Sequence, residues 1–150
     1  MLLRMVPEAI SAAWPSLEIH IKRSLPGEMG SDFVMNKLLE AFLLDRASVW
    51  VSYNPKESDE VNFIMVLTHL YDEYSNTKNL NIYAITNIKD IDLKTSNRMW
   101  LEGFVALRKY MQANGYSKLT GYFDQENFRS RKMVERFGGT IRYYTEIDMR

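Results

Sequence analysis

The chain has 150 residues, of which 46% are hydrophobic and 25% charged, and its 19 basic side chains balance 19 acidic ones. This size and composition predict one globular domain over residues 1–150, and the balanced charge argues against nucleic acid as a partner. The absence of cysteine excludes disulfides and thiol chemistry, and two histidines far apart in sequence predict no metal site. The few apolar residues before Pro7 predict no signal peptide and no membrane span, which favours a cytoplasmic location.

The first part of the chain predicts a strand followed by two helices. Residues 2–6 favour a short strand. Residues 8–25 favour a helix in two pieces with a break near Trp14, because Pro15 suits the first turn of a helix and not its interior. Ser31 is a good N-cap for the next helix, which runs to about residue 44. The side chains of that helix expected in the core are Val34, Leu38, Leu39, Phe42 and Leu43.

Two strands are predicted next. Residues 48–53 alternate, with Val49 and Val51 on one face and Trp50 on the other. Residues 61–71 are apolar nearly throughout, which is consistent with a central strand covered on both faces, although periodicity alone also allows a helix there.

Residues 79–139 form the centre of the predicted fold. An apolar run at residues 82–85 is followed by a polar loop and then by a helix with a broad apolar face, which Asn114 and Gly115 end. Residues 117–123 resume the alternation of a strand. Two strands joined by a helix of this length should lie parallel, since an antiparallel pair needs only a tight turn.

A short helix closed by Gly138 and Gly139, and a last strand at residues 140–147, complete the expected order β-α-α-β-β-β-α-β-α-β. The stretch ENFRSRKMVERFGG has Asn127 after a strand, then a helix with small and basic residues, then an apolar residue and Gly138. In this stretch and in its order of elements the chain resembles the GNAT (Gcn5-related N-acetyltransferase) superfamily. The resemblance covers nearly the whole chain.

The resemblance implies an α/β (α+β) fold. Its sheet would be mixed, mostly antiparallel and twisted, with about six to seven strands flanked by about four helices. Acetyl-coenzyme A would bind where the fourth and fifth strands splay apart. The pantetheine arm would pair with the fourth strand at about residues 84–87, which include Ile85, Thr86 and Asn87.

The pyrophosphate would rest on N–H groups in the loop before the long helix, because a helix N-terminus offers unpaired donors and the positive end of a dipole to an anion. That loop corresponds to about residues 94–100, and its phosphate-facing residues would be Thr95, Ser96, Asn97 and Arg98. Asn127 would lie beside the cofactor arm, and Arg129 or Arg131 would meet the 3′-phosphate.

Two features depart from the family pattern. The family's loop carries spaced glycines, which let the backbone approach a phosphate, whereas KTSNRMW has none. The hydroxyls of Thr95 and Ser96 and the charge of Lys94 or Arg98 are the available substitutes. The position at which many members place a tyrosine acid is Val134 here.

The acid–base residues are therefore open, and His69, Tyr122 and Asp124 are the leading catalytic candidates. Amine acetylation needs a base near the attacking nitrogen, and the ordinary histidine pKa of about 6.5 suits that task. Glu73, Asp90 and Asp92 are further candidates by position. Each of these residues also has a simpler interpretation as a surface, turn or core side chain.

Two functional hypotheses follow from the sequence. The first is an acyl-CoA-dependent N-acyltransferase that moves an acetyl group from acetyl-CoA to a primary amine of a small molecule or a protein. The second is a catalytically inactive GNAT-fold protein of phage or accessory type that binds a partner or builds an assembly. A homodimer is expected under the resemblance, because the family often dimerises through its terminal strands. A nucleotide-binding domain is the weakest candidate, because no Gly-rich phosphate motif follows a strand.

Overall fold

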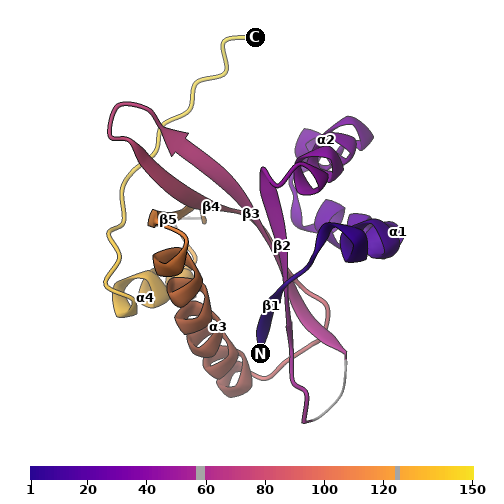
Figure 1. Cartoon of the computed structure of the whole chain (residues 1–150). Helices are drawn as coiled ribbons and strands as arrows, with labels where there is room; N and C mark the ends of the chain where they lie inside the picture. The colour runs from indigo at the N-terminus through magenta and orange to yellow at the C-terminus, as the bar shows by residue number, and fades with distance from the viewer. Residues whose placement is uncertain (57–59, 124–125) are drawn as a thin grey trace.

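The computed structural model describes residues 1–56, 60–123 and 126–150. The elements are β1 (Leu2–Arg4), α1 (Pro7–Ser24), a 3-10 helix (Gly27–Gly30), α2 (Asp32–Leu43), β2 (Ala47–Tyr53), β3 (Val61–Asp72), β4 (Thr77–Asn87), α3 (Leu93–Ala113), β5 (Tyr116–Gly121) and α4 (Phe128–Arg136). Helices α1 and α2 lie on one side of the sheet, and α3 and α4 lie on the other (Figure 1). No helix in the described part of the chain is both long and apolar enough to cross a membrane.

The five strands of the described sheet follow the chain in the order β1-β2-β3-β4-β5. All neighbouring pairs are antiparallel except β4 and β5, which are parallel and joined through α3. The predicted βαβ unit and the central position of β3 are thereby confirmed. The fold is GNAT-like, and the sheet of the described residues has one or two strands fewer than expected.

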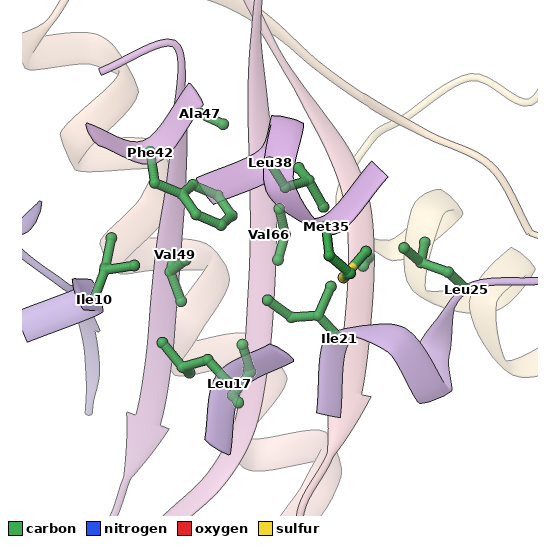
Figure 2. Close-up of a cluster of buried hydrophobic side chains, with 12 residues drawn as sticks. Ile10, Leu17, Ile21, Leu25, Met35, Leu38, Phe42, Ala47, Val49 and Val66 are labelled. Atoms are coloured by element: carbon green, nitrogen blue, oxygen red, sulfur yellow. The ribbon is translucent and has the colours of Figure 1, made fainter. Parts of the chain in front are cut away.

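The core on the α1 side packs both N-terminal helices against the sheet (Figure 2). Helix α2 begins at the predicted cap, where the Ser31 hydroxyl accepts the N–H of Val34. Its buried stripe consists of Met35, Leu38 and Phe42. The expectation that Leu43 is a core residue was wrong, because its side chain is 46% exposed and lies off this stripe.

The predicted break in the first helix was also wrong. Helix α1 runs unbroken from Pro7 to Ser24 with Pro15 in its interior. Proline removes one backbone hydrogen bond and crowds the preceding turn, at a cost of about 3 kcal/mol. The helix continues because Ile10 on one side of the proline, and Leu17 and Ile21 on the other, are buried in the same core. Burial of each such side chain contributes about 1.5–3 kcal/mol, which outweighs the local cost.

The core on the α3 side joins the other face of the sheet to α3. Trp50, Phe63 and Met65 from the strands are buried with Leu107 and Met111 from the helix. The helix ends at the predicted signal, because Asn114 is its C-cap and Gly115 has a φ of 73°.

Two aromatic stacks hold α3 against the sheet and against α4. The Trp100 ring stacks on Phe63 with centroids 5.1 Å apart, and Phe104 of α3 stacks on Phe137 at the end of α4 with centroids 3.9 Å apart. Helix α4 is therefore held against α3.

The segment after α4 differs from the sequence prediction. Gly138 adopts a φ of 74°, and a Cβ on Gly139 would lie 2.7 Å from Val134 Cγ1, so both glycines are needed where the chain turns away from α4. Residues 140–150 form neither helix nor strand, so the expected last strand at residues 140–147 was wrong. A segment of alternating apolar and polar residues forms a strand only when a neighbouring strand pairs with it and an apolar surface packs against its apolar side.

Candidate functional site

Strands β4 and β5 separate halfway along the sheet. Their paired positions run from Lys78 and Tyr116 to Ile82 and Gly121, whereas β4 continues to Asn87. Beyond Ile82, β4 is paired only with β3 among the described residues. The N–H and C=O groups on the other edge of residues 83–87 therefore have no strand partner among the described residues, and we call this point the fork.

A β-bulge coincides with the fork. Ala84 pairs with Val66 and Ile82 pairs with Leu67, which leaves Tyr83 as the extra residue of β4. Its ring packs at the border of the α1-side core, and burial raises the pKa of its hydroxyl. Bulges redirect side chains and are frequent beside active sites. No local pattern signals the bulge, because the apolar run at residues 82–85 is equally typical of an unbroken strand.

The predicted cofactor-binding residues of β4 lie on the open stretch. Ile85, Thr86 and Asn87 pair with Met65, Ile64 and Phe63 of β3, respectively, and their other edge has no partner in the described sheet. The chain then runs through residues 88–92 into α3, so the open edge leads directly to the helix N-terminus.

The expected phosphate loop is helical instead. Because α3 begins at Leu93, Thr95, Ser96, Asn97 and Arg98 lie in its first two turns. The N-cap is Asp92, whose Oδ1 accepts the N–H of Thr95 at 2.9 Å. The N–H of Ser96 donates to the Asp92 carbonyl, also at 2.9 Å. The amides that the resemblance assigns to a pyrophosphate are thus bonded within the chain.

The Asp92 carboxylate also places a negative charge at this helix end. Hydrogen bonds from the Thr95 hydroxyl and N–H hold the pKa of Asp92 below its usual range. Asp92 is thus the N-cap of α3 as well as a candidate base by position, and aspartate directly before a helix is a favoured cap.

Helix α4 contributes a cation to the same place. Arg129 Nη2 donates to Ser96 Oγ at 2.6 Å and to Asn97 Oδ1 at 3.4 Å. Ser96 is 9% exposed, so this contact is partly shielded from water. The structure therefore brings together three of the residues considered from the sequence.

The other predicted residues of α4 are close to this contact in sequence. Asn127 caps the helix, since its Oδ1 accepts the N–H of Ser130 at 3.0 Å. The Nε of Arg131 is buried and has no hydrogen-bond partner among the described residues.

The three catalytic candidates predicted from the sequence lie in different places relative to the fork. His69 lies opposite Leu80, within the part of the sheet where β4 and β5 are paired, and its ring contacts Tyr116 with centroids 5.8 Å apart. Burial, and then the charge of Arg4, lower the pKa of His69, and its Nε2 is buried with no partner among the described residues. His69 is thus a half-buried residue of β3 that lies away from the open edge.

Tyr122 is the candidate that lies at the fork. It directly follows Gly121, is 75% exposed, and its ring lies 5.3 Å from that of Tyr144. Asp124 lies outside the described residues. In the described part of the chain, no group of three histidine or acidic side chains could hold a metal ion.

A pocket of about 450 Å³ lies between α1 and the ends of the strands, away from β5. Its lining includes Leu17, His20, Val51, Ile64 and Ile88. The lining is mainly aliphatic, so we place the candidate site at the fork, where the unpaired edge of β4 leads through residues 88–92 to the N-terminus of α3.

A parallel strand pair that opens beside a helix N-terminus is the architecture of the GNAT acetyltransferases, and comparison with solved structures supports this fold. The chain aligns over its full length with the crystal structure of a probable acetyltransferase (TM-score 0.73, 10% identity, 99% of that chain). It also aligns over its full length with aminoglycoside N-acetyltransferase AAC(6′)-Iy in complex with a CoA-based bisubstrate analogue (TM-score 0.70, 11% identity, 97% of that chain).

A third solved structure is the ribosomal-protein-alanine N-acetyltransferase from Brucella melitensis biovar Abortus 2308 (TM-score 0.64, 11% identity, 100% of this chain and 99% of that chain). At these identities the likeness concerns the fold. No protein-family model matches the sequence, and no curated protein matches it in sequence.

Proposed function

We propose that the protein is an N-acyltransferase that takes an acetyl group from acetyl-CoA and transfers it to a primary amine. The observation that carries this proposal is the fork, which leaves the backbone of residues 83–87 unpaired on the side facing β5. An extended ligand with amide groups can add to such an edge as an extra strand would, because the exposed N–H and C=O groups alternate along it. The pantetheine arm of coenzyme A is a ligand of this kind.

The phosphates of the ligand would be held chiefly by side chains. Asp92 occupies the first amides of α3, so the positive charges available are Lys94 and Arg98 on α3 and Arg129 on α4. Arginine binds phosphate through paired N–H groups, and these contacts are stronger than neutral hydrogen bonds. In this proposal Arg129 exchanges its bonds to Ser96 and Asn97 for bonds to phosphate.

The chemistry is direct transfer at the fork. The amine nitrogen attacks the thioester carbonyl, the C–N bond forms, the C–S bond breaks, and the amine proton passes to a base or to water. The departing thiolate needs a proton. We assign that role to Tyr83, because it stands on β4 at the fork and its phenol is protonated at neutral pH, with a pKa that burial raises. Tyr122 flanks the same point from the β5 side.

A second function is favoured by the N-cap of α3. Asp92 fills the amides that would otherwise bind a pyrophosphate, and Val134 replaces the tyrosine that many family members carry. These two features suit a protein that keeps the fold without the reaction and acts by binding a partner.

Calorimetry with acetyl-CoA separates the two functions. If the protein is a transferase, acetyl-CoA should give measurable heat and raise the melting temperature. Dephospho-CoA should raise the melting temperature less if Arg129 or Arg131 contacts the 3′-phosphate. The absence of both heat and thermal shift at millimolar acetyl-CoA would exclude the transferase and leave the binding protein.

A further inference from the structure

The aliphatic pocket beside α1 lies on the same face of the sheet as Tyr83. Ile64 lines the pocket and belongs to the α1-side core, against which the Tyr83 ring also packs. The bulge leaves Ala84 on this face as well. Thr86 pairs with Ile64, so the two side chains share the face, and the next residue of this alternation, Ile88, lines the pocket. One face of β4 therefore connects the fork with the pocket.

The length of this connection suits a small substrate. The pairing with β3 continues just past the end of β4, because the Ile88 N–H donates to the Asn62 carbonyl at 2.9 Å. At about 3.3 Å per residue, Ile88 lies about 13 Å along the strand from Ala84. The pocket has a volume of about 450 Å³, which is within the usual range of small-molecule sites. A single small molecule can therefore have one end at the fork and the other in the pocket.

The proposed cofactor and the amine would reach the fork from opposite faces of the sheet. The cations proposed for the phosphates, Arg98 and Arg129, belong to α3 and α4, which lie across the sheet from α1 (Figure 1). A cofactor bound there leaves the α1 face of the fork to the second substrate. The pocket is then on the side from which the amine arrives.

The lining of the pocket favours an apolar ligand. Aliphatic side chains such as Leu17 and Val51 form most of it. The charged lining residues Glu60 and Lys89 form an ion pair with each other, so their charges offset. A second ammonium group of a ligand would lose its hydration against this lining, whereas methylene groups gain by leaving water.

We infer that the amine acceptor is a primary amine on an uncharged apolar body, with its amino group at the fork and its apolar body in the α1-side pocket. This inference rests on the proposed function, and it names the substrate class of that function. It predicts that the protein discriminates against amines that carry a second charge at their far end.

The first test compares amines as acceptors of the acetyl group. From butylamine to octylamine, kcat/KM should rise about fourfold for each methylene that enters the pocket. The diamine with the same chain length as octylamine should give a kcat/KM at least about tenfold lower, because its second ammonium would enter an aliphatic pocket. Steady-state assays with acetyl-CoA measure these values.

Substitutions on α1 locate the apolar body. Ala13 and Ser16 line the pocket, so Ala13→Phe and Ser16→Phe should each fill it and remove the advantage of octylamine over butylamine. Ser16 is exposed, which makes its substitution the safer one for folding. Ala12→Phe is the matched control, because Ala12 is exposed on the same helix and is not part of the lining. Circular dichroism and thermal melting should show all three variants folded.

A binding measurement separates the inference from the proposed reaction. In a ¹H–¹⁵N NMR titration of the full chain with octylamine, the shifted amide signals should gather at Leu17, Ile64 and Ile88. No shifts there, equal use of octylamine and its diamine, or equal effects of Ala12→Phe and Ala13→Phe would overturn the inference, even if amines are acetylated. Shifts at the pocket with acetylation of no amine would instead overturn the transferase and support the pocket as a site for apolar amines.

Discussion

Tyr83 and Tyr122 are the first residues beyond the last β4–β5 pair, Ile82 and Gly121, and so stand one on each strand at the fork. Their surroundings differ. Tyr83 is part of a bulge and borders the α1-side core, whereas Tyr122 is 75% exposed. Burial raises the pKa of the Tyr83 hydroxyl. This difference allows their roles to be separated by experiment.

If Tyr83 protonates the leaving thiolate, Tyr83→Phe should lower kcat roughly 100-fold or more with little change in KM, since general acid catalysis contributes about 10²–10⁴-fold. Tyr122→Phe is the matched control and should change kcat much less. Steady-state assays with acetyl-CoA and a primary amine measure both. Equal losses in the two variants, with unchanged circular dichroism, would contradict the assignment.

Asp92→Asn should tighten the binding of acetyl-CoA about two- to fivefold. Asparagine still caps the helix, but the negative charge beside the phosphates is gone. Isothermal calorimetry measures the change. Ser31→Ala at the cap of α2 is the control, because it should cost about 1 kcal/mol of stability without affecting binding. Unchanged affinity in Asp92→Asn would mean that the phosphates do not lie at this helix end.

The stability of the protein should fall as the pH drops below about 6.5, the ordinary pKa of histidine. His69 has a lowered pKa in the folded chain, so the unfolded chain takes up the proton first and protonation favours unfolding. The stability is therefore complete above that pH and is lost as the pH falls toward the folded-state pKa. His69→Phe keeps an aromatic ring beside Tyr116 and should flatten this part of the profile. Urea titrations at several pH values measure it, and an identical slope in both proteins would contradict the prediction.

Pro15→Ala should stabilise the protein by about 1–2 kcal/mol. Proline inside a helix costs about 3 kcal/mol, and alanine removes part of this cost by restoring a helical hydrogen bond. The gain is smaller than the full cost because the unfolded chain regains the flexibility that proline had restricted. Pro7→Ala is the control, because Pro7 is in the first turn of α1, where proline is well suited, and should be neutral or slightly destabilising. Chemical denaturation provides the comparison. A loss of stability in Pro15→Ala would show that the proline is required where it lies.

Patterns that need only local chemistry were predictable. Ser31, Asn114 and Asn127 end or begin helices where the sequence indicated, because their side chains or backbone preferences act within one turn. The parallel pairing of β4 and β5 followed from the length of the helix between them. These features depend little on the rest of the molecule.

Features that depend on distant residues were missed. The bulge at Tyr83 arises from the register with β3 and leaves no mark in the apolar run of residues 82–85. Pro15 was expected to break α1, but buried side chains on both sides keep the helix whole. The start of α3 was misplaced because the expected loop was carried over from the resemblance, whereas Asp92 already indicated the cap.

The α1-side core has a consequence for the order in which the chain acquires structure during synthesis. Every buried member of that core except Ala84 lies in the first half of the chain. This layer can therefore close while the second half is still inside or near the ribosome. The opposite face of the same sheet must wait for Leu107 and Met111, and until then its aromatic side chains are a surface that a chaperone would recognise.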